Sequence, residues 1–521
     1  MTPTKTRAIV IASALLATFA FCVATALDVS DYADVYVRSR ELPAEREFLT
    51  GISFRQQQSS QKRTVNNSLT FDSRHSLSLS FKALQRQFTA SLHHNAELWH
   101  PKAVISVLDG EGDLIDTHSA QLVGNNAYLG EATIEHEVED GGMKKRRQEK
   151  AFVSAVVVDY ERGLFHMSII SSSEDGDNFV VEPTYLHHSG AEERRRRGEI
   201  NHEEEELLLG ENMVVYKENV LDLTSMVDDA KRNDNEEAAE HCGNDVKLEA
   251  EDDGGDADLF DDVSPTGRCP PADDTYLLVG VATDNQYTRQ AGGVTGTRNT
   301  VSWIFNTMQG HFYRAVRNKP VLKSLVIHVS ASSSSSSSSF NSRSCPSSIQ
   351  SRLTPFCVWR ARQRDSSIGL WHLLSGCLPD RQRIAGRAYY SSICQDNTRG
   401  CGISGYLGGN ARWVVPTHEI GHNFGARPGS EIMSPYVNPS ADGFSDDSIR
   451  EMCYYTFRRY SRTHCLLSKL PDDHDVPDGG DEDDDGQGQC ECRDDNDNNL
   501  NKEDSGAQAT VGSSVLIEAI F

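Results

Sequence analysis

The sequence is poor in positive charge. Its 521 residues contain 51 Lys and Arg against 77 Asp and Glu, which gives a formal net charge of −26. A nucleic-acid-binding protein needs a basic surface to neutralise phosphates, so this composition argues against nucleic acid as a partner. The acidic excess is concentrated in residues 233–262 and 471–504, whose net charges are −12 and −13. We expect both blocks to be solvated, self-repelling segments.

Long hydrophobic runs are absent after the first 26 residues. No later stretch approaches the ~18 apolar residues that a membrane-spanning helix requires. The N-terminus carries Lys5 and Arg7, an apolar run over residues 8–23, and Ala24-Thr25-Ala26. These are the three parts of a secretory signal peptide. We therefore predict cleavage before Leu27 and a secreted protein without a membrane span; retention of the run as a membrane anchor is the alternative.

Cysteine is scarce in the first half of the chain. Cys22 is lost with the signal peptide, and 11 of the 12 cysteines then remain. In an oxidising compartment, an odd number indicates that one thiol has a separate role or pairs with another chain. Asn66 lies in an Asn66-Asn67-Ser68 sequon and is a candidate glycosylation site, in keeping with export.

Residues 27–190 read as a β-rich first region. Alternating or β-branched residues predict strands in four places. These are Ser76–Phe81, Ala103–Leu108, Phe152–Val158 and Leu164–Ile170. Two basic sites follow, Arg194–Arg197 and Lys231-Arg232. Each is either a processing-protease site or a solvated charge run.

A second region begins after the first acidic block. Hydrophobic patterns predict a strand over Tyr276–Ala282, a helix over Thr300–Val316 and a strand over Val321–Val329. The order strand–helix–strand indicates an α/β domain from about residue 270 to 467. Beyond it, we expect residues 468–521 to form an acidic and mostly disordered tail.

The candidate chemistry lies in His418-Glu419-Ile420-Gly421-His422. On a helix, residues four positions apart share a face, so both imidazoles can reach one Zn²⁺ ion. Glu419 can accept a proton from the water that the metal activates, which is the mechanism of a zinc endopeptidase acting on proteins or peptides. Gly425 allows a sharp turn after the helix. Met433 lies in a candidate Met-turn.

The segment 413–435 resembles the adamalysin/reprolysin (ADAM-type) metzincin metalloproteinases, most closely their fungal-type members. Their pattern is H-E-x-x-H-x-x-G-x-x-H followed by a Met-turn. The likeness covers about residues 70–467. Its further segments are Ile368–Cys377, Phe340–Cys345 and Thr275–Phe312, and, for a reprolysin-like propeptide, Phe81–Trp99, Asn126–Gly130 and Phe179–Pro183.

The resemblance implies a zymogen in four parts. We expect a signal peptide (1–26), a propeptide (27–268), a zinc metalloproteinase domain (269–467) and the acidic tail (468–521). The expected fold is a metzincin-like α/β catalytic domain, with a mostly parallel twisted sheet and an active-site helix. It is preceded by a β-rich prodomain, of which 70–190 is the β-rich part and 233–262 the acidic part.

The resemblance also assigns the odd cysteine. Cys242, in His241-Cys242-Gly243, is similar to the cysteine switch of such prodomains, whose thiolate fills the open zinc position. A disulfide-bonded Cys242 is the alternative. Cys345–Cys465 and Cys394–Cys401 are plausible bridges, although spacing alone does not fix the connectivity.

One position departs from the family pattern. The third zinc ligand should fall at residue 428, which is Pro428, and nothing in the spacing of nearby Glu431 recommends it as a substitute. A skipped exon in the gene model, a degenerate protease or a rearranged working site would each explain this. Two functions therefore remain open: a secreted zinc endopeptidase made as a zymogen, or a catalytically impaired pseudoprotease that binds without cleaving.

Overall fold

The structure is a computed structural model that describes sixteen stretches of the chain. They are residues 32–36, 46–49, 53–57, 76–120, 126–140, 143–159, 162–173, 176–184, 213–218, 274–332, 339–345, 348–363, 365–377, 384–395, 398–463 and 465–470. The expected signal peptide (1–26), Asn66, Cys242, both basic sites and nearly all of the expected acidic tail lie outside these stretches. The described residues belong to one compact unit, Met1–Asp472.

The first sheet has nine antiparallel strands and consists entirely of residues before 219. Its order is β2-β12-β11-β10-β9-β8-β5-β4-β3. The bounds are β2 (Arg46–Leu49), β3 (Ser53–Gln57), β4 (Ser76–Ala83), β5 (Arg86–His94), β8 (Ala127–Asp140), β9 (Met143–Asp159), β10 (Leu164–Ser171), β11 (Asn178–Pro183) and β12 (Met213–Glu218). The expected strands at 76–81, 152–158 and 164–170 lie within β4, β9 and β10. The prediction that a β-rich region precedes the second region is therefore confirmed.

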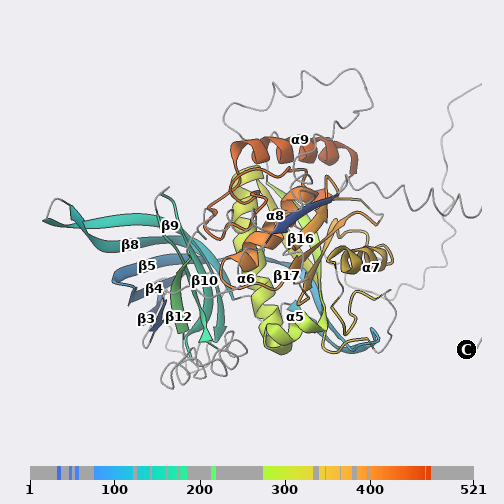
Figure 1. Cartoon of the computed structure of the whole chain (residues 1–521), viewed down its shortest axis with the longest axis horizontal. Helices are drawn as coiled ribbons and strands as arrows, with labels where there is room; N and C mark the ends of the chain where they lie inside the picture. Colours follow the sequence, from blue (N-terminus) through green and yellow to red (C-terminus); the bar gives the residue numbers. More distant parts are fainter. Residues whose placement is uncertain are drawn as a thin grey trace, which may run out of the picture. The chain divides into compact units, whose positions relative to one another are not determined.

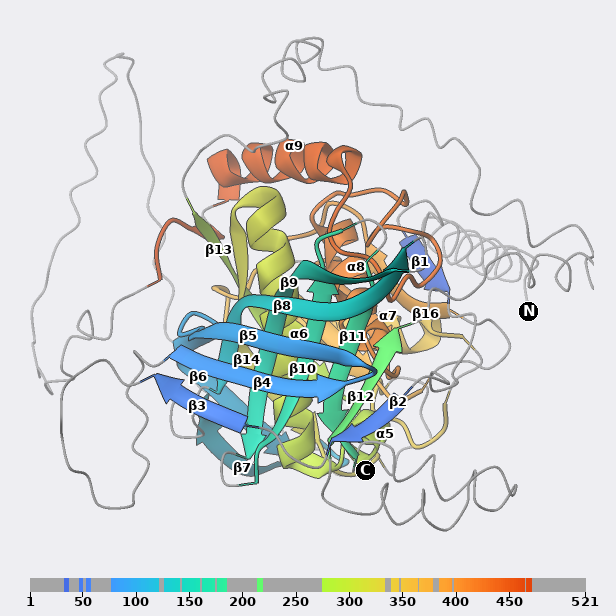
Figure 2. The same cartoon turned by 90° about the vertical axis from the view of Figure 1, so that its left-hand side faces the viewer.

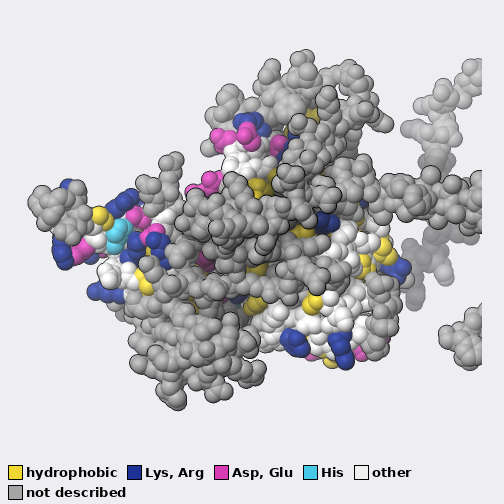
Figure 3. All heavy atoms as spheres, viewed as in Figure 1, with side chains coloured by type: hydrophobic (Ala, Val, Ile, Leu, Met, Phe, Trp, Pro, Cys, Tyr) yellow, Lys and Arg dark blue, Asp and Glu magenta, His cyan; other side chains and the backbone are white. Residues whose placement is uncertain are grey.

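Charged side chains gather over the β8–β9 hairpin of this sheet (Figure 3). Cross-strand pairs Arg146–Glu135 and Lys144–Glu137 join the two strands at 2.8 Å and 3.2 Å. The buried face of the same sheet holds a stacked pair, Phe81 and Phe88, with ring centroids 4.9 Å apart. Period-two alternation sends successive side chains to opposite faces, and β4 and β5 accordingly bury every second residue over most of their length.

The second sheet is mixed, with the order β1-β16-β17-β15-β13-β14-β6-β7, and β18 pairs with β13. Five neighbouring strands of this sheet, β6, β14, β13, β15 and β17, are parallel to one another. Strand β16 pairs with β17 in the antiparallel direction. The bounds are β1 (Tyr32–Tyr36), β6 (Trp99–Leu108), β7 (Leu114–Ser119), β13 (Thr275–Thr283), β14 (Asn318–His328), β15 (Leu370–Ser375), β16 (Ile384–Tyr389), β17 (Cys401–Gly405) and β18 (Leu466–Leu467).

Three strands of this mixed sheet come from the N-terminal region. The expected strand at 103–108 lies within β6, but it pairs with β14 rather than with the other early strands. The reason is burial, because Ala103 and Ile105 alternate with more exposed residues and belong to the core shared with α6. The N-terminal region is therefore part of both sheets.

Five helices accompany the sheets within the described residues (Figure 1). They are α5 (Asn285–Gln290), α6 (Gly293–Val316), α7 (Gln350–Arg360), α8 (Ala411–Asn423) and α9 (Asp446–Thr463). The expected helix at 300–316 is present but begins earlier, at Gly293. None of these described helices combines the length and the apolar composition needed to cross a membrane.

Helix α6 lies between the two sheets, and Figure 2 shows the antiparallel sheet crossing in front of it. It contacts β14 on one side and β8, β9 and β10 on the other. A helix surrounded in this way is buried on most of its faces, so its polar side chains need hydrogen-bond partners. Trp303, Phe305 and Phe312 are fully buried, and the polar side chains of Asn306 and Gln309 are buried as well.

The structure corrects both expected disulfide pairings. Each of the four cysteines is bonded, but to other partners than the sequence suggested. The bridges are Cys345–Cys377, Cys357–Cys401 and Cys394–Cys465. Cys357 reaches Cys401 because α7 packs on β17. The spacing of cysteines in the sequence cannot predict such a tertiary contact.

We predict that Phe312→Ala destabilises the fold by about 3–5 kcal/mol, because it leaves a cavity where three elements meet. The Phe312 ring packs 4.8 Å from Phe424, just after α8, and 5.0 Å from Phe444, just before α9. Denaturant unfolding would measure the loss. The control Leu114→Ala removes a side chain that is 63% exposed and should change stability by less than about 0.5 kcal/mol. Equal effects of the two variants would contradict this core assignment.

Candidate metal centre on helix α8

Helix α8 carries His418, Glu419 and His422, and all three side chains are fully buried. The helix packs against α6 and against β16 and β17. It ends because Gly425 adopts φ +96°, where a Cβ would lie 2.9 Å from the Cβ of Tyr455. The Ala426 N–H then donates to the Gly421 carbonyl at 3.0 Å, which closes the helix end. The expected turn at Gly425 is confirmed.

The two histidines lie one helical turn apart and face each other. Their Nε2 atoms are 2.9 Å apart, and the ring planes are nearly perpendicular at 89°. Two nitrogens bound tetrahedrally to one zinc ion at ~2.0–2.1 Å would be on the order of 3.3 Å apart. The observed separation is within about half an ångström of that value.

Each ring is anchored through its other nitrogen. His418 Nδ1 lies 2.7 Å from the Ile432 carbonyl oxygen, and His422 Nδ1 lies 2.6 Å from the Ala426 carbonyl oxygen. A carbonyl accepts only, so each Nδ1 carries the proton. Metal-binding histidines are typically held in this way, with the second ring N–H donated to a carbonyl.

Burial keeps both rings neutral. Desolvation lowers the pKa of His418 to about 4 and lowers the pKa of His422 well below its usual value of 6.5. With Nδ1 protonated and the ring uncharged, Nε2 is a bare lone pair in both residues. Two such lone pairs at 2.9 Å repel each other, and a cation between them turns that repulsion into attraction. The pair therefore fits a divalent cation such as Zn²⁺.

Met433 lies directly beneath α8. Gly421 lies between the two histidines in the sequence. A Cβ at this position would lie 2.6 Å from the Met433 sulfur, so only a glycine leaves room for the Met433 side chain. Met433 is fully buried, and its N–H donates to the Ser430 carbonyl at 3.0 Å in a tight turn. The same loop supplies the Ile432 carbonyl that orients His418. The loop and the helix thus form one packed unit.

Among the residues that the structure describes, no third ligand lies beside the pair. Pro428 is exposed, and Glu431 is also exposed, with a left-handed backbone at φ +55°. Within the described stretches, no group of three or more His, Cys, Asp or Glu residues is placed to hold a metal ion. The described donor set therefore consists of two imidazoles.

Glu419 lies on the side of α8 that faces strand β16, which lies between β1 and β17 in the mixed sheet. A Cβ on Gly386 would lie 2.5 Å from Glu419 Oε1, so this glycine is required for the carboxylate to approach the strand. Gly386 is paired with Val35 of β1 on the other side. The carboxylate is therefore next to the backbone of β16, at the position where β16 pairs with β1.

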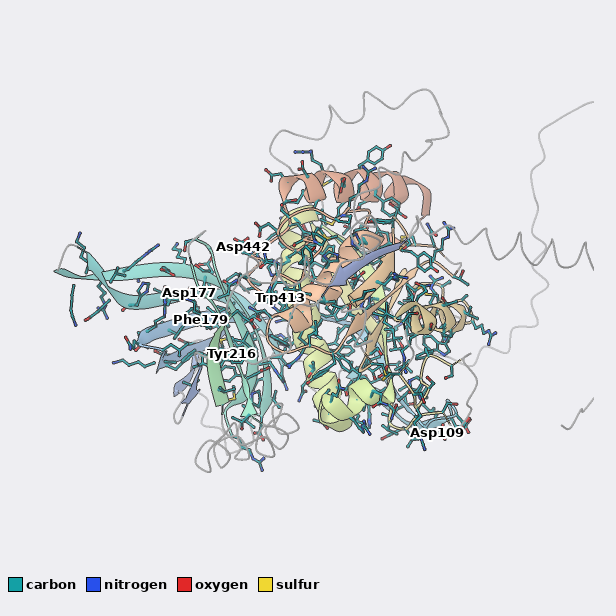
Figure 4. The ribbon with its side chains drawn as sticks, in the orientation of Figure 1. Asp109, Asp177, Phe179, Tyr216, Trp413 and Asp442 are labelled. Carbon is teal, nitrogen blue, oxygen red and sulfur yellow. A yellow bond between two sulfur atoms is a disulfide. The ribbon has the colours of Figure 1, made fainter. Side chains whose placement is uncertain are left out.

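Sequence reasoning missed a polar cluster at the other end of α8. Arg412 Nη1 lies 3.0 Å from Glu182 Oε2, and both side chains are almost completely buried. Figure 4 labels Tyr216 on the sheet side and Trp413 on the helix side of this region. One signal in the sequence could have indicated this cluster. Glu182 is the single charged residue in the otherwise apolar run Phe179–Pro183, and a carboxylate buried in such a run requires a partner.

Comparison with protein families identifies one match. Residues 272–462 match a family model of the reprolysin type, described as metallo-peptidase family M12. The matched segment begins just before β13 and ends within α9, so it contains α8 and the loop after it. Members of this family are zinc-dependent peptidases. No curated protein matches the chain.

We predict that Zn²⁺ raises the melting temperature of the protein through His418 and His422. At a hundredfold excess over the dissociation constant, one site stabilises the fold by about 2.7 kcal/mol. His418→Gln and His422→Gln should each abolish the shift. His118→Gln, at a half-exposed surface position, is the control and should retain it. A full zinc-induced shift in either α8 variant would exclude this pair as the site.

Proposed function

We propose that the protein is a secreted zinc endopeptidase made as a zymogen, because residues 272–462 match a reprolysin-type model of metallo-peptidase family M12. The observation that carries the proposal is the facing pair of Nε2 atoms, each ring anchored at Nδ1. We assign His418 and His422 as the zinc ligands. The bound ion would supply Lewis acidity, polarising a peptide carbonyl and acidifying a water molecule.

The chain's own residues have distinct roles in this proposal. Glu419 is the general base and receives the water proton on a carboxylate oxygen. The carbonyls of Ile432 and Ala426 hold the imidazole tautomers, and Met433 supports the helix from below. The parallel strands of the mixed sheet, with antiparallel β16 at their edge and α8 packed on them, support a metzincin-like α/β catalytic domain.

Complete burial of His418, Glu419 and His422 supports a latent form, because neither water nor substrate reaches these groups from the surface. We assign latency to Cys242, whose thiolate would occupy the remaining zinc position. Activation would then require cleavage by a processing protease, at Arg194–Arg197, at Lys231-Arg232 or further downstream. Export would follow from the signal peptide, with Asn66 as a glycosylation site.

A pseudoprotease is the second candidate, favoured by one specific observation. The described residues supply only two ligands, and exposed Pro428 occupies the position of the third. Two imidazoles hold zinc less firmly than three, because each lost ligand weakens the chelate. Such a protein would bind peptides without cleaving them.

We predict that Glu419→Gln lowers peptide cleavage by the processed protein by a factor of about 10²–10⁴, since the general base is removed. The zinc-induced rise in melting temperature should persist, because both imidazoles remain. Cleavage of a quenched fluorescent peptide library measures the first effect. Wild-type protein that binds zinc but cleaves no better than Glu419→Gln would leave only the pseudoprotease.

We predict that Pro428→His increases zinc affinity at least about tenfold by restoring the third position of the H-E-x-x-H-x-x-G-x-x-H pattern. Arg427→His is the matched control, because it adds the same imidazole to the neighbouring exposed position. Isothermal titration with Zn²⁺ distinguishes the two. Equal affinities would indicate that this loop does not reach the metal.

A further inference from the structure

A small pocket lies beside α6, where this helix meets strands of both sheets. Its volume of about 10 Å³ leaves room for roughly one water-sized group, and it is partly open to solvent. Three of its lining residues belong to α6, namely Arg298, Asn299 and Ser302. The remaining ones come from β6 and β9 and from the chain next to β7 and β8. The pocket is separate from the candidate metal centre, because none of its lining residues belongs to α8 or to the loop after it.

Arg298 brings a positive charge to this pocket. Its side chain is half-buried, and within the described stretches its one hydrogen bond is from Nη2 to Asn299 Oδ1 at 3.4 Å, a long and therefore weak contact. Burial lowers the pKa of the guanidinium, because no described carboxylate offsets its loss of hydration. An arginine is nevertheless charged at neutral pH. The pocket thus holds a cation without a described counter-charge.

Two other arginines show what a buried guanidinium requires in this protein. Arg352 pairs with Asp284 at 2.6 Å, and Arg412 pairs with Glu182 at 3.0 Å. Each of these charges is kept in the interior by the carboxylate opposite it. Among the described residues Arg298 has no such partner, so its counter-charge has to come from elsewhere.

Asn299 and Ser302 add neutral donors to the same pocket. Asn299 is 4% exposed, and among the described residues its Nδ2 has no hydrogen-bond partner. Because its Oδ1 accepts from Arg298, both Nδ2 hydrogens are left for another acceptor. Ser302 follows three residues after Asn299 and four after Arg298, so the three side chains share one face of the helix. A buried amide donor of this kind costs free energy unless an acceptor lies in the pocket.

We propose that Arg298, Asn299 and Ser302 form a binding site for one small monovalent anion, and that chloride is the ion that fits. The guanidinium, the amide and the hydroxyl would all donate to it. A water molecule could accept the same hydrogen bonds but would leave the positive charge of Arg298 uncompensated. Phosphate and sulfate are larger than one water-sized group. This site is independent of the proposed peptidase function, because it shares no residue with it.

The first test is thermal unfolding of the full chain in sodium chloride and in sodium gluconate at equal ionic strength. Gluconate is too large for the pocket, and EDTA in both buffers prevents chloride from binding through zinc. For a dissociation constant of about 10 mM, roughly 200 mM chloride should raise the melting temperature saturably by on the order of 3 °C. Bromide should act like chloride. The absence of a chloride-specific rise, as expected if a carboxylate from elsewhere in the chain filled the pocket, would overturn the proposal.

Arg298→Met tests whether the rise comes from this pocket. It keeps an unbranched side chain of similar length but removes the charge, so the chloride-specific rise should disappear. The matched control is Arg289→Met on α5, where the arginine is exposed and donates to Gln286 Oε1 at 2.7 Å. General effects of salt act on all three proteins alike, so they cancel in the comparison. A wild-type response in Arg298→Met would exclude the site.

Asn299→Asp tests the charge argument while Arg298 stays in place. The new carboxylate lies beside the guanidinium and supplies the counter-charge that the anion would supply. We expect its melting temperature in gluconate to exceed that of the wild type, with no further rise in chloride. An unchanged chloride response in this variant would contradict the role of charge neutralisation.

Bromide locates the ion directly, because its anomalous scattering distinguishes it from water. Crystals soaked in sodium bromide, at the concentration that saturates the thermal response, should show an anomalous peak between the Arg298 guanidinium and Asn299 Nδ2. Crystals of Arg298→Met should lack the peak. A wild-type pocket without bromide at that concentration would overturn the proposal.

Discussion

The candidate site depends on one arrangement: two uncharged imidazoles held with their lone pairs toward each other inside the protein. Helix geometry alone brings His418 and His422 to one face, but it does not choose the tautomer. That choice comes from two backbone carbonyls in the loop after the helix, at Ala426 and Ile432. The loop is in turn fixed by Gly425 and by Met433 packed under Gly421. Ligand geometry is thus a property of the helix and its following loop together.

Local sequence signals predicted what is local in the structure. Alternation over 76–81, β-branched residues over 152–158 and the 3.6-residue pattern over 300–316 each gave the correct element. The spacing also predicted that the two histidines share a helix face and that a turn follows at Gly425, because these are properties of one helix and one turn.

Non-local pairing could not be read in this way. Strand β6 has the same pattern of alternation as its neighbours in sequence, yet it joins the mixed sheet because Ala103 and Ile105 complete the core around α6. The disulfide pairings expected from the sequence were wrong, because the packing of α7 on β17 brings Cys357 to Cys401. Arg412 and Glu182 are 230 residues apart, and neither has a local pattern that names the other.

The position of β6 also has a consequence for synthesis. A ribosome produces β6 some 210 residues before it produces β14, the parallel neighbour that pairs with it. Until then, one edge of β6 has open N–H and C=O groups, the kind of edge that recruits strands from other chains. Nascent chains of this protein should therefore need protection from association over this interval. A chain truncated before residue 318 should aggregate, even though its antiparallel sheet is complete.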